Sequence, residues 1–269
     1  MSLFDGLGAI CDRWLGVDDA WEGQPPRYPH LANFQLLYRN GWGGWNGERL
    51  MWDLYGQISM NWSGGPCVGQ ENWRFEKQLN LGPNNLNQEV TLERTITLIT
   101  DENWVNQVPI ASGVDDTGSH YAIDLLHRSG SQFTFIELKV EANHPLYAAI
   151  QIIQYGLVYV FSRIHADQLG YQMMNTALLR AGEVRLQVLA PATYYNPPAS
   201  IAWLLQLENS LNTGLEQFAR KVLQIPMGFM FRVFPTDFLW VPAQHMEPEV
   251  RKDLLWALHN RNSIMQPAL

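Results

Sequence analysis

The sequence predicts an α/β fold in which a mixed central β-sheet is flanked by helices. The chain has 269 residues, of which 46% are hydrophobic, so it is long and apolar enough for a well-buried core. From Gln88 onward, segments with the alternating pattern of strands are interspersed with apolar segments of helical length. This order of elements is typical of a sheet with helices packed against it.

The predicted elements of this core follow one another along the chain. Residues 88–99 have apolar side chains at helical spacing, but apolar residues also fall on alternate positions, so the segment could be a strand; we favour the helix. Pro145 suits the start of a long apolar helix, and Ser200 suits the N-cap of a second one. The other predicted elements are strands at 120–128, 132–140, 183–190 and 228–240 and a last amphipathic helix within 246–262.

The first 85 residues differ from the rest of the chain. They are rich in Gly, Trp and Asn, and Gly-Gly and Gly-Pro pairs separate short segments, which favours hairpins and loops over long helices. We therefore expect an aromatic-rich β/loop elaboration over 1–85, a core over 86–240 and a helical tail over 241–269. Five of the tryptophans in the first part lie within residues 38–75: Trp42, Trp45, Trp52, Trp62 and Trp73. They could stack on bases, but without interleaved basic residues we favour packing inside a small core.

Composition narrows the class of protein. Cys11 and Cys67 are too few for a disulfide framework and lack a zinc-type spacing, which fits a reducing cytoplasm. The first residues do not resemble a signal peptide, and no stretch of about 18 uninterrupted apolar residues predicts a membrane span. The net charge of −8 repels polyanions at long range, so contact with nucleic acid would have to be local; ordinary solubility also explains this charge. Phosphate-binding loops, nucleophile elbows and zinc-protease motifs are absent from the sequence.

Three charged residues interrupt the apolar pattern of the two strands at 120–128 and 132–140. Glu137 and Lys139 are two positions apart, so in a strand their side chains point to the same face. Asp124 is a lone charge in the preceding strand, and a hairpin through the Ser-Gly-Ser turn could bring it beside them. Lysine is depleted in strands and rarely buried without a partner, and Lys139 is one of only four lysines in the chain.

Such a cluster has two interpretations. Two carboxylates can hold a hard divalent cation, and an ammonium beside them can orient or help deprotonate an attacking water, which suits metal-assisted hydrolysis of a phosphodiester. Alternatively, Glu137 and Lys139 form a structural ion pair on the exposed face of an edge strand. The position of Asp124, the helix that follows and the order of elements favour the functional interpretation.

The segments AIDLL and FIELKV resemble the motif of the PD-(D/E)xK nuclease superfamily, with Asp124, Glu137 and Lys139 at the motif positions. In the helix that follows, Gln151 and Tyr155 match the Q-x-x-x-Y pattern of RecB-like members; being four apart, they share a helix face. The family core is a helix, a strand hairpin, a helix and a further strand, which corresponds here to residues 88–195. The residue before Asp124 is isoleucine rather than the proline of the motif, a position that varies in the family.

The resemblance implies a restriction-endonuclease-like core and a Mg²⁺- or Mn²⁺-dependent nuclease acting on DNA. It implies Asp124, Glu137 and the backbone carbonyl of Leu138 as metal ligands, with Lys139 positioning the attacking water. An acidic residue of the preceding helix often completes the set, and Glu93 is the candidate, with Glu89 in reserve. Gln151 and Tyr155 would support the site from the next helix.

The alternative is the same fold without catalysis, as a module that binds nucleic acid or protein. The oligomeric state stays open, a homo-oligomer included.

Overall fold

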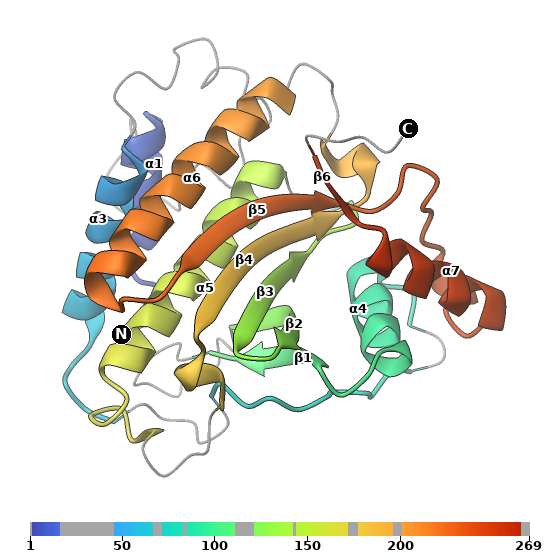
Figure 1. Cartoon of the computed structure of the whole chain (residues 1–269), viewed down its shortest axis with the longest axis horizontal. Coiled ribbons are helices and arrows are strands. Elements are labelled where there is room, and N and C mark those ends of the chain that lie inside the picture. The colour runs from blue at the N-terminus through green and yellow to red at the C-terminus, as the bar shows by residue number, and fades with distance from the viewer. Residues whose placement is uncertain are drawn as a thin grey trace.

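A six-stranded mixed sheet with helices on both faces forms the centre of the molecule (Figure 1). The structure, a computed structural model, describes residues 2–16, 46–66, 72–82, 85–110, 121–141, 144–171, 177–195 and 201–264. Its strands are β1 (Trp104–Pro109), β2 (Ala122–Ser129), β3 (Gln132–Leu138), β4 (Glu183–Ala190), β5 (Met227–Val233) and β6 (Asn262–Ser263). Its α-helices are α1 (Leu7–Leu15), α3 (Gly47–Asn61), α4 (Gln88–Ile99), α5 (Pro145–Ile164), α6 (Ile201–Val222) and α7 (Pro248–His259).

The strands lie in the sheet in the order in which they occur in the sequence. Strands β1, β2 and β3 form an antiparallel meander, β4 and β5 are parallel to β3, and β6 returns antiparallel to β5. The parallel steps are made through α5 and α6, because parallel strands need a long crossover. The β2–β3 hairpin closes through a two-residue turn between Ser129 and Gln132, where Gly130 has a φ of 62°. A glycine adopts this left-handed conformation without strain, which suits the twist of a hairpin.

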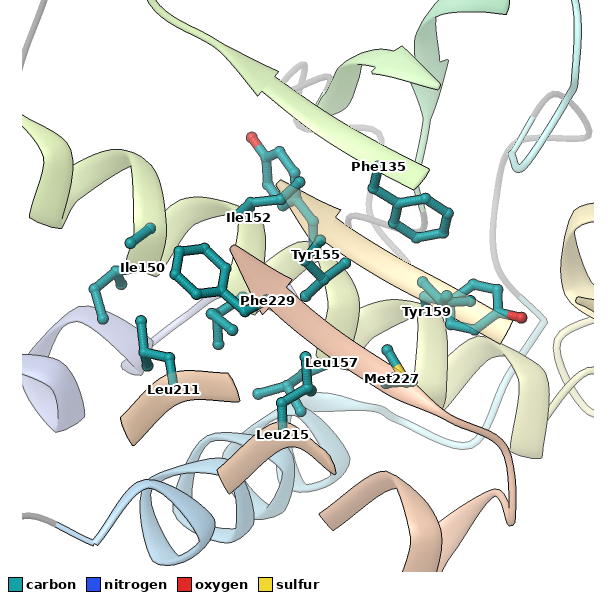
Figure 2. Packing of buried hydrophobic residues seen from close by; sticks show 14 of the residues in the cluster. Phe135, Ile150, Ile152, Tyr155, Leu157, Tyr159, Leu211, Leu215, Met227 and Phe229 are labelled. Carbon is teal, nitrogen blue, oxygen red and sulfur yellow. The ribbon is translucent and has the colours of Figure 1, made fainter. Parts of the chain in front are cut away.

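Two apolar cores cover the two faces of the sheet. The larger core packs α5, α6, α3 and α1 against side chains such as Phe135 of β3 and Phe229 of β5. Figure 2 shows Phe229 near Ile150 of α5 and Leu211 of α6, and Phe135 near Tyr159 of α5. The smaller core packs α4 and α7 against Ile136 and Leu189 on the opposite face. Because strand residues alternate between faces, this division explains the alternating apolar pattern of β3 to β5.

The helix α5 is the central element of the larger core. Its 20 residues begin with Pro145 at N1, and the ring Nδ1 of His144 accepts a hydrogen bond from the N–H of Tyr147. Among the described residues it is the one helix long and apolar enough to cross a membrane, but 89% of its apolar window is buried inside the fold. This burial is that of a core helix packed against a sheet.

The structure confirms the mixed sheet flanked by helices and most of the predicted core elements. The strand predicted at 228–240 ends at Val233. Residues 88–99 form a helix, the interpretation that we favoured, and the Asn87 side chain caps it by accepting a hydrogen bond from the N–H of Val90. The prediction of hairpins and loops is wrong over Leu7–Leu15 and Gly47–Asn61, which are the helices α1 and α3. The sequence analysis also missed β1 and β6. Trp42, Trp45 and Ser200 lie outside the described residues.

Candidate active site

Glu137 and Lys139 form a buried ion pair where β3 ends. Glu137 lies on the sheet face that carries Phe135, and Lys139 follows the last residue of the strand. The Nζ of Lys139 is 2.7 Å from Oε1 of Glu137, and the side chains are only 7% and 1% exposed. The peptide N–H of Lys139 donates to the carbonyl of Leu189 in β4, which fixes the backbone at this point. An exposed ion pair on an edge strand is therefore excluded, because β3 lies between β2 and β4.

Asp124 joins this pair from the neighbouring strand. Leu125 pairs with Ile136 across the β2–β3 hairpin, so the preceding Asp124 lies opposite Glu137. The Oδ2 of Asp124 accepts a hydrogen bond of 2.9 Å from the N–H of Leu138. The aspartate thereby fixes the backbone at Leu138, the residue whose carbonyl the family resemblance implies as a metal ligand; that carbonyl lies in the next peptide unit, whose N–H donates to Leu189. The hairpin brings together all three motif residues that the sequence analysis singled out.

Burial disfavours the charged forms of the two carboxyl groups of this site, Glu137 and Asp124. Burial, followed by the charge of Asp124, raises the pKa of Glu137 well above its usual range. Burial also raises the pKa of Asp124, although Lys139 and the Leu138 N–H oppose this shift. Apart from Lys139 and Asp124, no described group satisfies the two buried oxygens of Glu137. A site with buried, incompletely satisfied carboxylates is suited to bind a cation.

Lys139 is held in its charged form. Burial alone would lower the pKa of its ammonium, but the charges of Glu137, Asp124 and Glu89 outweigh burial and raise it. The amine is therefore a proton donor and a positive charge at neutral pH. It can orient a water molecule and stabilise negative charge, while accepting a proton from that water is disfavoured.

Two glutamates of α4 approach the cluster from the other side. The Oε2 of Glu89 is 3.8 Å from Nζ of Lys139, and its Oε1 accepts a 3.4 Å hydrogen bond from the N–H of Val140. Glu93 is already bound, because its two oxygens accept hydrogen bonds from the side chains of Asn106 (2.6 Å) and Gln107 (2.5 Å). Burial and the charge of Asp124 raise the pKa of Glu93 to about 7. Glu89 therefore contacts the lysine, whereas Glu93 influences Asp124 through its charge.

Gln151 and Tyr155 lie on one face of α5, as their spacing predicts. The Nε2 of Gln151 donates a 2.9 Å hydrogen bond to the hydroxyl of Tyr155. Burial, followed by the charge of Glu137, raises the pKa of Tyr155, which places its ring beside the acidic cluster. The next residue, Gly156, allows this close packing, because a Cβ there would collide with the side chain of Leu186 in β4. The helix is thus held close to the sheet where the site lies.

Several neighbours of the site were not found by sequence analysis. Tyr147 of α5 and Tyr194 of the 3₁₀ helix Ala192–Tyr195 have pKa values raised by burial and by nearby charges that include Glu137. Asn106 and Gln107 belong to β1, the strand that the sequence analysis missed. The two amides are adjacent between Val105 and Val108, so the segment lacks the strict alternation that indicates a strand, and no charged residue drew attention to it.

The donor set fits a divalent cation held in part by the protein. Asp124 and Glu137 offer two carboxylates, and the Leu138 carbonyl lies between Glu137 and Lys139 in the chain. Hard cations such as Mg²⁺ typically take one or two carboxylates and keep several waters. Within the described ranges, no three His, Cys, Asp or Glu side chains are grouped closely enough to hold a metal by themselves.

Comparison with known proteins gives no match: no protein-family model, no curated protein and no solved structure is similar to this chain.

Proposed function

We propose that the protein is a Mg²⁺- or Mn²⁺-dependent nuclease of the PD-(D/E)xK type that hydrolyses phosphodiester bonds in DNA. The observation that carries the proposal is the convergence of Asp124, Glu137 and Lys139 within one buried cluster at the end of the β2–β3 hairpin. The order α4, strand hairpin, α5, β4 supports a restriction-endonuclease-like core. The Gln151–Tyr155 pair on the adjoining helix supports the RecB-like type.

In this proposal Asp124, Glu137 and the Leu138 carbonyl hold the cation. The cation supplies Lewis acidity towards the phosphodiester and the attacking water. Lys139, kept protonated by its carboxylate neighbours, orients that water and stabilises the charge that develops on the phosphate. Gln151 and Tyr155 position the Glu137 side of the site from α5. Glu89 contacts Lys139 and tunes the charge of the cluster. We place this activity in the cytoplasm, in keeping with the free, buried Cys11.

The test is a nuclease assay on linear, nicked and single-stranded DNA with Mg²⁺ or Mn²⁺. We expect Asp124→Asn and Lys139→Gln each to reduce the cleavage rate by about 100- to 1,000-fold, the usual loss when one group that stabilises a transition state is removed. A matched control is Glu216→Gln, because this glutamate lies on α6 in an exposed ion pair with Arg220. Cleavage that is metal-independent, or equal in wild type and Lys139→Gln, would refute the proposal.

A second candidate function is the same fold without catalysis, as a binding module. Two observations favour it: Lys139 forms a direct ion pair with Glu137, and the described part of the chain holds no group of three His, Cys, Asp or Glu side chains that could bind a metal. Calorimetric titration with Mg²⁺ separates the two candidates. The nuclease requires metal-dependent heat that is lost in Asp124→Ala, whereas the binding module gives no such heat.

A further inference from the structure

A second polar site lies on the sheet face opposite to Glu137, between the strands and the end of α7. It is a pocket of about 410 Å³, within the size range of small-ligand sites. Its floor consists of side chains from β2 to β5 that alternate with those of the larger core, among them Gln187 and Arg232. In Figure 1, α4 and α7 lie together at one end of this face. The pocket occupies the part of the face that these helices leave open.

The charges that line this pocket are all of one sign. Three arginines and two histidines contribute to the lining, and none of the described residues that form it carries a carboxylate: Arg185, Arg232, Arg261, His127 and His259. Two carboxylates outside the lining act on Arg185 and His127. Glu183 forms an ion pair with Arg185 at 2.7 Å, and the charge of the exposed Asp101 opposes the lowering of the pKa of His127 that burial causes. Neither Arg232 nor Arg261 forms an ion pair with a described carboxylate; Arg232 donates to the sulfur of Met230 at 3.2 Å, and Glu208 of α6 interacts with it only through its charge. In a chain of net charge −8, this pocket is therefore a local excess of positive charge.

Two contacts hold the guanidinium of Arg261, although none of the described carboxylates forms an ion pair with it. Its guanidinium lies over the ring of Trp104, 5.4 Å from the centroid, and donates to the carbonyl of Leu258. The ring of Trp104 also stacks on the ring of His127, with the two centroids 4.4 Å apart. Burial, and after it the charge of Arg232, lowers the pKa of Arg261 to about 10, so its charged form is held there at an energetic cost. Both arginines line the pocket, and an anion bound between them would reduce that cost.

A buried amide supplies the independent indication of a ligand. Gln187 lines the pocket from β4 and is only 3% exposed. Its Nε2 is buried and has no hydrogen-bond acceptor among the described residues. A buried donor without a partner is unfavourable and rare in folded proteins. An acceptor atom in the pocket would satisfy it.

We propose that this pocket binds the phosphate group of a phosphate monoester, between the guanidinium groups of Arg232 and Arg261 and the amide of Gln187. A phosphate monoester carries a charge of about −1.5 to −2 at neutral pH and accepts several hydrogen bonds, so it can neutralise two arginines at once. A carboxylate carries one charge and balances only one of them. The planar guanidinium fork binds both carboxylate and phosphate oxygens through two parallel hydrogen bonds, so the charge of the ligand is what favours phosphate here. The phosphate group can belong to a free mononucleotide or to the end of a nucleic-acid strand.

The test is calorimetric titration of the full chain at constant ionic strength with EDTA present, so that the carboxylate site carries no metal. The probes are inorganic phosphate, deoxyadenosine monophosphate, deoxyadenosine, acetate, and an oligonucleotide with or without a 5′-phosphate. We expect binding of phosphate and of the monophosphate, and none of deoxyadenosine or acetate. Stronger binding of the mononucleotide assigns the pocket to small esters, and stronger binding of the 5′-phosphorylated oligonucleotide assigns it to strand ends.

Two variants and one control complete the experiment. Arg232→Gln and Gln187→Leu are each expected to weaken phosphate binding about tenfold or more, the usual effect of losing a charge-assisted hydrogen bond. Gln187→Leu should not lower the melting temperature in phosphate-free buffer, because it removes an unsatisfied buried amide. Arg220→Gln on α6, an exposed arginine outside the pocket, should leave binding unchanged.

The proposal is overturned if phosphate and acetate give equal responses, or if Arg220→Gln weakens binding as much as Arg232→Gln. Nuclease activity does not enter this test, so its outcome is independent of the proposed function.

Discussion

Two ion pairs of equal length differ in nearly every other respect. Lys139–Glu137 in the carboxylate cluster and Arg185–Glu183 at the pocket both have an N–O distance of 2.7 Å. The first pair is 7% and 1% exposed and lies among further carboxyl groups; the second is 44% and 31% exposed. Water screens the second pair, whereas the first has only its protein neighbours. Environment rather than distance therefore decides what each pair contributes to stability and function.

The largest effect is expected from breaking the buried pair. Lys139→Met leaves Glu137 buried beside Asp124 without its positive partner, which typically destabilises a protein by about 3–5 kcal/mol. The loss should be larger at pH 8 than at pH 5, because protonation of Glu137 removes the uncompensated charge. Urea unfolding at both pH values measures it. Lys252→Met is the control, since this lysine is 79% exposed; an equal loss in both variants would show that burial is irrelevant.

Replacing both members of the buried pair sharpens the comparison. Glu137→Met combined with Lys139→Met removes both charges while keeping volume, and such replacements of buried pairs are often neutral or stabilising. We expect the double variant to recover most of the stability that the single Lys139→Met change loses, roughly 2–4 kcal/mol, and to lack nuclease activity. A double variant as unstable as the single one would mean that the lysine stem, not its charge, stabilises this part of the fold.

The two polar sites also differ in how far the sequence could predict them. Asp124, Glu137 and Lys139 interrupt two short apolar strands, so strand alternation and hairpin register were enough to bring them together. Arg232 and Gln187 of the pocket look like ordinary strand residues, and they come from strands linked only by long crossovers. Their proximity depends on strand order and on the position of α7, which local pattern does not encode. The strand β1, which supplies the amides that hold Glu93, was missed for a local reason: the adjacent Asn106 and Gln107 break the alternation of apolar and polar residues.

A third prediction concerns the pH dependence of the carboxylate cluster. The pKa of Glu93 is raised from 4.5 to about 7, so its protonated form stabilises the fold fully below 4.5, and this contribution is lost as pH rises through 7. With about 1.4 kcal/mol per pKa unit, the whole change is roughly 3–4 kcal/mol. The melting temperature in EDTA should therefore fall between pH 5 and pH 8. Glu93→Gln, which cannot ionise, should reduce this fall; an unchanged profile would contradict the assignment.

The smallest effect is expected at the exposed pair. Arg185→Gln removes the guanidinium partner of Glu183, but pairs of this exposure contribute only about 0–1 kcal/mol and less at high salt. The unfolding midpoint should shift barely above experimental error at low salt, and not at all in 1 M NaCl. Thermal unfolding at the two salt concentrations measures this, with Lys139→Met run alongside. Because salt screens exposed charges far more than buried ones, the Lys139→Met loss should persist at high salt. If both losses vanish together, the buried pair is as open to solvent as the exposed one, and the contrast between the two sites fails.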